Sequence, residues 1–218
     1  MNRILPNLRY RMTYKEIKTP FLIIAIALFT TSCDNNNANE SNANPGSNEE
    51  RAKTEQPENI AQVKPSFSNL DKNVSDHIKS IFDHYIHVKT ALVNSNASEA
   101  KDGATAILSV IKGFDKSLLP SEQKAAYDKV IGGIKATAES IASTDAIEKQ
   151  REHFSALSNQ AYELAKSFGA GKTIYHEHCP MAFDNKGAMW LSESKEIKNP
   201  YYGEKMIECG SVKEVIEK

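Results

Sequence analysis

The sequence has few cysteines, no long hydrophobic run and little net charge. Its 218 residues include three cysteines and one tryptophan, and 27 basic residues nearly balance 28 acidic ones. The apolar run Phe21–Phe29 spans about nine residues, whereas a helix that crosses a bilayer needs roughly 20. The Gly-x-Ser-x-Gly and His-Glu-x-x-His motifs are absent, and we therefore expect no enzymatic activity.

The N-terminus has the parts of an export signal. Five basic residues precede the short apolar run, and Thr30-Thr31-Ser32 follows it directly before Cys33. A basic segment, a short apolar core and small residues before a processing site are typical of secretory signals. The four residues Thr30 to Cys33 resemble a lipobox. We predict that residues 1–32 are a lipoprotein signal peptide and that Cys33 is lipidated. The alternatives are an uncleaved anchor or a free cysteine.

The predicted mature chain is acidic. Residues 1–32 contain five basic residues and one acidic residue, so their removal leaves 22 basic and 27 acidic residues and a formal charge of −5. An acidic surface does not attract nucleic acid. We expect a membrane-anchored protein of the cell envelope, periplasmic or surface-exposed, that binds no nucleic acid.

Residues 33–66 are rich in Asn, Ser, Glu and Pro and nearly free of apolar residues. Such a stretch cannot bury enough surface to offset its ordering entropy. We predict a disordered, lipid-anchored tether here, with the folded part beginning near Phe67.

Residues 67–170 predict four amphipathic helices, because apolar residues recur at helical spacing. The stripes are Val74, Ile78, Ile81, Phe82, Tyr85, Val88 and Leu92; Ala100, Ala104, Ile107, Leu108 and Ile111; Tyr127, Val130, Ile131, Ile134, Ala138 and Ile141; and Ile147, Phe154, Leu157, Ala161, Leu164 and Phe168. Asn96 with Glu99 is expected to cap the second helix, Pro120-Ser121 to begin the third, Ser143 or Thr144 to cap the fourth, and Gly169 to end it. The short breaks favour a mainly α fold, an antiparallel four-helix bundle.

Residues 171–218 differ in kind. Residues around Ile174 look extended, turn residues dominate afterwards, and helical period returns only at Val212–Ile216. We predict a short irregular or extended segment packed on the bundle and pinned there by packing, a crosslink or a metal. Gly169-Ala-Gly171-Lys172-Thr173 resembles the end of a phosphate-binding loop, but Lys166 stands where that motif requires glycine. We interpret it as a helix stop and a flexible joint.

This C-terminal segment concentrates soft metal ligands. Thiolate and thioether groups favour Cu(I), and thiolate with imidazole also suits Zn(II). The candidate ligands are Cys179, Met181, Met206, Cys209, His176 and His178. In an oxidising compartment the two cysteines are equally candidates for a disulfide that staples the segment. Met189 beside Trp190 is interpreted as core.

Three motifs in this segment resemble a known family. They are His-Cys-Pro-Met-Ala from His178, Gly-Ala-x-Trp-Leu-Ser from Gly187 and Asn-Pro-Tyr-x-Gly-x-x-Met-x-x-Cys-Gly from Asn199. The combination, with the helical run from Arg151, is similar to a bacterial domain of uncharacterised function. That domain occurs in lipoproteins and on periplasmic adaptor subunits of heavy-metal (copper and silver) efflux pumps.

The Cys-Pro-Met core is also similar to short heavy-metal-binding domains of such adaptors, which continue with histidine where this chain has Ala182. The resemblance implies metal handling by Cys179, Met181, Met206 and Cys209.

Three histidines, His77, His84 and His87, share a flank of the first predicted helix. They suit a second metal or pH-sensitive site, but their position beside the apolar stripe favours solvated boundary residues.

The sequence thus predicts an envelope lipoprotein that captures Cu(I), or Ag(I) or Zn(II), and passes it to a heavy-metal efflux adaptor or pump. The alternative is a structural or protein-interaction lipoprotein closed by a Cys179–Cys209 disulfide.

Overall fold

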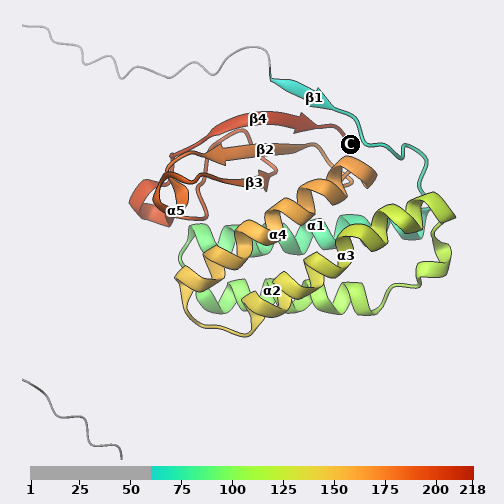
Figure 1. Ribbon diagram of the computed structural model, residues 1–218, viewed down its shortest axis with the longest axis horizontal. Helices are drawn as coiled ribbons and strands as arrows, with labels where there is room; N and C mark the ends of the chain where they lie inside the picture. The colour runs from blue at the N-terminus through green and yellow to red at the C-terminus, as the bar shows by residue number, and fades with distance from the viewer. Residues whose placement is uncertain (1–59) are drawn as a thin grey trace, which may run out of the picture. The chain divides into compact units, whose positions relative to one another are not determined.

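The computed structural model describes residues 60–218 (Figure 1). The predicted signal peptide, the lipidation site Cys33 and most of the predicted tether lie outside the described residues. No helix within residues 60–218 combines the length and apolar character needed to cross a bilayer.

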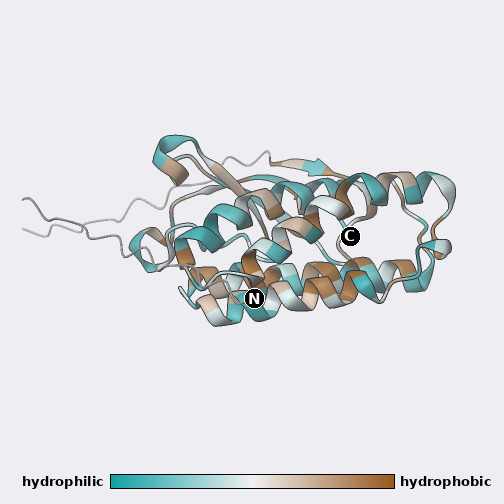
Figure 2. Ribbon diagram, turned by 60° about the horizontal axis from the view of Figure 1, so that its bottom comes forward, coloured by the Kyte–Doolittle hydropathy of each residue, from teal (hydrophilic) through white to brown (hydrophobic). Residues whose placement is uncertain are grey.

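Four long helices form where the apolar stripes predict them: α1 (Lys72–Val93), α2 (Ala97–Lys112), α3 (Ser121–Ala142) and α4 (Ile147–Phe168). Apolar and polar residues alternate along them (Figure 2), and most stripe residues are buried. The expected caps at Asn96 and Gly169 are confirmed: the Asn96 carboxamide accepts a hydrogen bond from the backbone N–H of Glu99 at 3.1 Å, and Gly169 adopts φ 71°.

The cap predicted for the fourth helix is wrong. Helix α4 begins at Ile147, after Ala146, with no side-chain cap. The Thr144 hydroxyl instead accepts a hydrogen bond from the backbone N–H of Ala146 at 3.2 Å. This local turn competes with helix capping and holds the chain outside the helix.

The helices pack in sequence, α1 against α2, α2 against α3 and α3 against α4, and α1 also contacts α4. Glycine permits two close approaches. A Cβ on Gly103 of α2 would lie 2.8 Å from Val88 Cγ2 of α1, and a Cβ on Gly133 of α3 would lie 2.8 Å from Gln160 Cδ of α4. These contacts bring the helix backbones together around one apolar core.

The C-terminal segment is more regular than predicted. It contributes β2 (Ile174–Cys179), β3 (Ala188–Ser192) and β4 (Ser211–Ile216), with the short turns α5 (Ala182–Asn185) between β2 and β3 and η2 (Gly203–Met206) between β3 and β4. A further short turn, η1 (Lys116–Leu118), connects α2 and α3. Strand β2 pairs antiparallel with both β3 and β4. The helical period predicted for Val212–Ile216 is therefore wrong, because a short apolar run fits either period and its partner strand decides.

The fourth strand comes from the predicted tether. Strand β1 (Ala61–Val63) pairs in parallel with β4, giving the sheet order β1-β4-β2-β3. Regular structure is therefore present about six residues before Phe67, the residue near which the sequence predicts that the folded part begins. The backbone N–H of Glu217 extends this pairing by donating to the Val63 carbonyl at 2.9 Å.

The sheet covers α1 and α4, while α2 and α3 lie on the far side of the helical layer (Figure 1). Tyr85 of α1 joins the two layers: its hydroxyl accepts from the backbone N–H of Leu191 at 3.0 Å and hydrogen-bonds the Ser158 hydroxyl of α4 at 2.7 Å. The fully buried indole of Trp190 in β3 also joins the apolar core. The sheet is thus fixed on the helices by both polar and apolar contacts.

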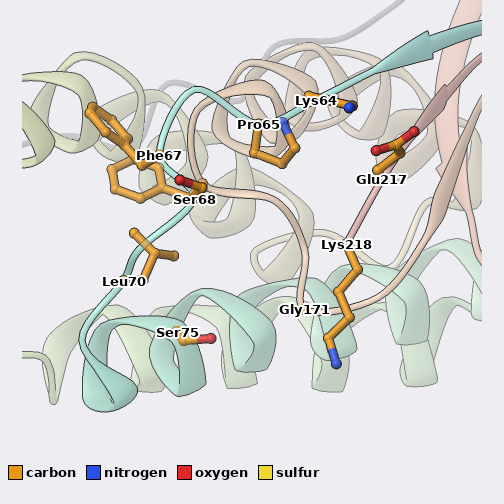
Figure 3. A pocket seen from close by; sticks show the side chains of 10 residues that line it. Lys64, Pro65, Phe67, Ser68, Leu70, Ser75, Gly171, Glu217 and Lys218 are labelled. Carbon is orange, nitrogen blue, oxygen red and sulfur yellow. The ribbon is translucent and has the colours of Figure 1, made fainter.

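A cavity of about 570 Å³ lies where the start of the described chain meets its end. Figure 3 shows Phe67 and Leu70 on one side of it and Glu217 and Lys218 on the other. Phe67 packs on Phe168 with ring centroids 5.2 Å apart. The lining residues include no histidine or cysteine, so this cavity offers no imidazole or thiolate ligand for a metal ion.

Candidate functional site at the cysteine pair

The two cysteines of the described chain meet at one end of the sheet. Cys179 ends β2, Cys209 lies two residues before β4, and their Sγ atoms are 2.8 Å apart. Both are free thiols, Cys179 fully buried and Cys209 partly exposed. The pair can hold a shared ion or close into a disulfide.

Asn199 positions Cys209. Its side chain is fully buried and donates from Nδ2 to the Cys209 carbonyl at 2.8 Å. Its backbone N–H donates to the Ile207 carbonyl at 2.8 Å, and its Oδ1 accepts from the backbone N–H of Tyr201 at 2.8 Å. These three bonds close the 199–209 loop and bring Cys209 back to the end of β2.

The structure brings both predicted methionines to the cysteine pair through their backbones. The backbone N–H of Met181 hydrogen-bonds the Cys209 thiol, and the Met206 carbonyl accepts from the backbone N–H of Cys209 at 3.1 Å. Met181 is 44% exposed and Met206 is partly exposed. The site therefore combines a buried thiol, a partly exposed thiol and an exposed thioether residue.

The predicted histidines do not join this cluster. His176 is 5% exposed, stacks on Tyr162 at 3.9 Å between ring centroids, and has Nδ1 3.4 Å from Glu214 Oε2. His178 lies beside Gly187, where a Cβ would sit 2.7 Å from the imidazole Nε2. Burial lowers the pKa of both imidazoles. Within residues 60–218, no three or more His, Cys, Asp or Glu side chains form a group suited to a metal ion.

The protonation of Cys209 constrains its chemistry. Burial, followed by the hydrogen bond and charge of Cys179, raises the pKa of the Cys209 thiol to about 11. A thiolate is the metal ligand and the nucleophile. Metal binding or oxidation at neutral pH must therefore release a proton from Cys209, so either reaction should become more favourable as pH rises.

A strained turn follows the Cys-Pro-Met run. Phe183, Asp184 and Asn185 have φ of 51°, 57° and 63°, a left-handed conformation that costs roughly 1–2 kcal/mol per residue. The Phe183 ring packs edge-on against Tyr201 at 5.3 Å between centroids. Asp and Asn tolerate this region, but phenylalanine gives no such signal, and the sequence analysis missed the turn.

A cavity of about 320 Å³ lies beside this turn and includes Phe183, Tyr201 and Tyr202 in its lining. The Tyr202 hydroxyl donates to the Met181 carbonyl at 2.5 Å. Arg151, also in the lining, donates from Nε to the Pro200 carbonyl at 2.9 Å and from Nη2 to the Leu92 carbonyl at 3.1 Å. Arg151 thus anchors the loop that contains Tyr202 to the C-terminal end of α1 and to the N-terminal part of α4.

Sequence reasoning also missed a buried carboxyl group near the site. Glu177 is fully buried, and neither of its carboxyl oxygens has a hydrogen-bond partner within residues 60–218. It is paired in register with Trp190, whose buried indole N–H lies close enough to interact with the carboxyl group, although not in hydrogen-bond geometry. Burial raises the pKa of Glu177 to about 8, and the charge of Lys89 and the indole N–H of Trp190 oppose this rise. In the sequence, only its position two residues before Cys179 indicates that Glu177 lies near the site.

The histidines of α1 also differ from expectation. His77 was expected to be solvated but is buried, stacked on Phe114 at 3.7 Å between ring centroids, with Nε2 2.8 Å from the Tyr127 hydroxyl. His87 Nε2 lies 2.7 Å from Glu99 Oε2 at a partly exposed position. The aromatic partner Phe114 comes from the α2–α3 connection, which the helical pattern of α1 does not reveal. No shared histidine site forms.

Comparison with known proteins bears on the helices alone. No curated protein and no solved structure matches the chain. A family model described as a protein of unknown function, DUF3347, matches residues 81–173, and the matched region ends before β2 and the cysteine pair. Residues 81–173, which are 93 of the 218 residues of the chain, are therefore similar to the DUF3347 family.

Proposed function

We propose that this protein is an envelope lipoprotein whose cysteine pair captures a soft metal ion in support of heavy-metal efflux or homeostasis. The observation that carries the proposal is the meeting of two thiols at 2.8 Å beside the exposed Met181. Thiolate and thioether donors select Cu(I). Zn(II) usually takes four nitrogen, sulfur or oxygen ligands, and no third His, Cys, Asp or Glu joins the pair within residues 60–218. The donor set therefore favours Cu(I) or Ag(I) over Zn(II).

The protein around the site would serve capture and transfer. Lipidation at Cys33 and the following tether would hold the domain near a membrane, where an efflux adaptor or pump would receive the ion. Helices α1 to α4 would form an antiparallel bundle, since three to eight residues connect successive helices. Met181 would meet the ion first because it is exposed, and the buried Cys179 would complete the site. The role is binding rather than catalysis.

A second function is favoured by the burial of Cys179 and by its contact with Cys209. The pair would then close as a disulfide in a structural or protein-interaction lipoprotein. A crosslink between residues 30 positions apart stabilises a fold by about 3–4 kcal/mol in the chain-entropy account. It would tie the end of β2 to the start of β4 and hold the 199–209 loop.

A Cu(I) titration of the full chain against a competing chromophoric chelator tests the proposal, with thiols counted before and after reduction. The reduced protein should bind one equivalent, and the Cys179→Ser, Cys209→Ser double variant should bind none. Met181→Leu should weaken binding, whereas Met189→Leu on β3 is the matched control and should not. Equal binding by the double variant would refute metal capture. The absence of reactive thiols in native protein, with a melting temperature that falls on reduction and ignores metal, would establish the disulfide instead.

A further inference from the structure

A groove lies between α2 and α3, the two helices on the side of the helical layer away from the sheet (Figure 1). Its volume is about 550 Å³, and its apolar lining comes from Leu108, Ile111 and Ile131. Leu108 and Ile111 are only partly buried although they belong to the apolar stripe of α2. The apolar stripe of α2 therefore extends beyond the core and leaves part of Leu108 and Ile111 exposed.

Gly132, in the groove lining, has no structural reason to be glycine in the described chain. It lies in the interior of the 22-residue helix α3, where glycine costs about 1 kcal/mol relative to alanine. Its neighbour Gly133 is explained by the close approach of Gln160, but a Cβ on Gly132 would meet no atom within 4 Å. The missing side chain keeps the groove open and leaves the α3 backbone accessible.

The groove has a basic rim. Its charged lining residues are Lys112, Lys116, Lys135 and Glu139. Lys116 pairs with Asp128 at 2.8 Å and Lys135 with Glu139 at 3.8 Å, whereas Lys112 makes no ion pair within residues 60–218. Exposed pairs of this kind contribute little, so a ligand can exchange them. The local excess of positive charge contrasts with the net negative charge of the predicted mature chain.

We propose that the α2–α3 groove binds an acidic amphipathic helix of a partner protein. Helix-in-groove recognition places apolar anchors from one helical face into an apolar groove, and Leu108, Ile111 and Ile131 accept such anchors. Carboxylates beside the anchors pair with the rim lysines, which set the orientation and reject basic helices. Gly132 lets the partner helix approach the α3 backbone closely. This proposal involves none of the residues of the cysteine pair and is independent of metal binding.

Fluorescence anisotropy with the full chain and two labelled synthetic helices tests the proposal. Both peptides carry leucine on one face, and they differ only in having glutamate or lysine beside it. The acidic peptide should bind at least tenfold more tightly, and added salt should weaken its binding. Equal binding of the two peptides, or binding of neither, would overturn the proposal.

Variants locate the binding site. Gly132→Trp places a large side chain in open space and should weaken the acidic peptide at least tenfold while the circular dichroism stays unchanged. Lys112→Glu with Lys135→Glu should reverse the preference between the peptides, and Lys186→Glu in the exposed turn after α5 is the charge control and should not. Undiminished binding by folded Gly132→Trp protein would place the peptide elsewhere and refute the assignment.

Discussion

Replacing Glu177 by glutamine removes a buried ionisable group without changing the size of the side chain. The carboxyl group is fully buried between β2, β3 and α1, and its pKa rises from an ordinary 4.5 to about 8. Lys89 is also nearly buried, its pKa is lowered by burial, and its charge only partly offsets the burial of Glu177. Tyr85 of α1 also interacts with the charge of Glu177.

A raised pKa in the folded state means that folding favours the protonated acid. Stability from this group is therefore complete below about pH 4.5 and is lost as the pH rises towards 8. The slope is about 1.4 kcal/mol per pH unit, so the free energy of unfolding should fall by about 2–3 kcal/mol between pH 5 and 7 because of Glu177. Glutamine at this position stays neutral and removes that loss.

Urea unfolding of parent and Glu177→Gln protein at several pH values measures the effect. The difference between the two proteins isolates Glu177, because the buried His77 contributes a dependence of opposite sign below pH 6.5. The variant should be the more stable protein at pH 7, by an amount that grows with pH. Glu163→Gln at an exposed position of α4 is the control and should leave the pH dependence unchanged. A constant difference between parent and Glu177→Gln across pH 5 to 7 would refute the reasoning.

Three further predictions can be tested by urea unfolding. Gly132→Ala should raise the free energy of unfolding by about 1 kcal/mol through helix propensity. Gly103→Ala should lower it by about 1–2 kcal/mol, because the new Cβ would lie 2.8 Å from Val88. Equal changes in the two variants would contradict the close packing of α2 on α1 at Gly103. Asn185→Gly should stabilise and Asn185→Val destabilise the protein by about 1 kcal/mol, since φ is 63° there; the reverse order would show that the turn is not left-handed. Burial lowers the pKa of His77 to about 4, so the free energy of unfolding of the parent should fall by about 2 kcal/mol because of this group as the pH drops from 6.5 to 4.5. The His77→Gln variant should lack this loss. The same acid sensitivity in variant and parent would argue against a buried neutral imidazole.

The helices could be predicted because their information is local. A stripe such as Val74, Ile78 and Ile81 repeats at helical spacing and is buried on one side. The start of α4 could not be predicted, because Thr144 uses its hydroxyl in a turn before the helix. The sheet was missed for a related reason. Strand β1 has three largely exposed residues, and β4 carries an irregularity opposite His176 and Glu177 that disturbs its alternation.

The candidate site shows the same division. The density of cysteine and methionine identified the segment around Cys179 and Cys209, and the structure brings these thiols into contact. His176 lies away from the cysteine pair because its ring stacks on Tyr162, which lies in α4. The burial of Glu177 likewise depends on α1 and β3. Contacts between elements far apart in the sequence leave no periodic signal, so these features required the folded structure.

The place of β4 in the sheet determines when the fold can be completed. The strand follows every other described element in the chain, yet it lies between β1 and β2 and pairs with both. The helices can associate through contacts close in sequence, which form early, whereas β1 and β4 are separated by about 150 residues and their pairing carries a larger loop-closure entropy. During synthesis, β1 must therefore wait until residues 211–216 have been made. A protein that loses Ser211–Ile216 loses both pairings at once and leaves β1 without a sheet to join.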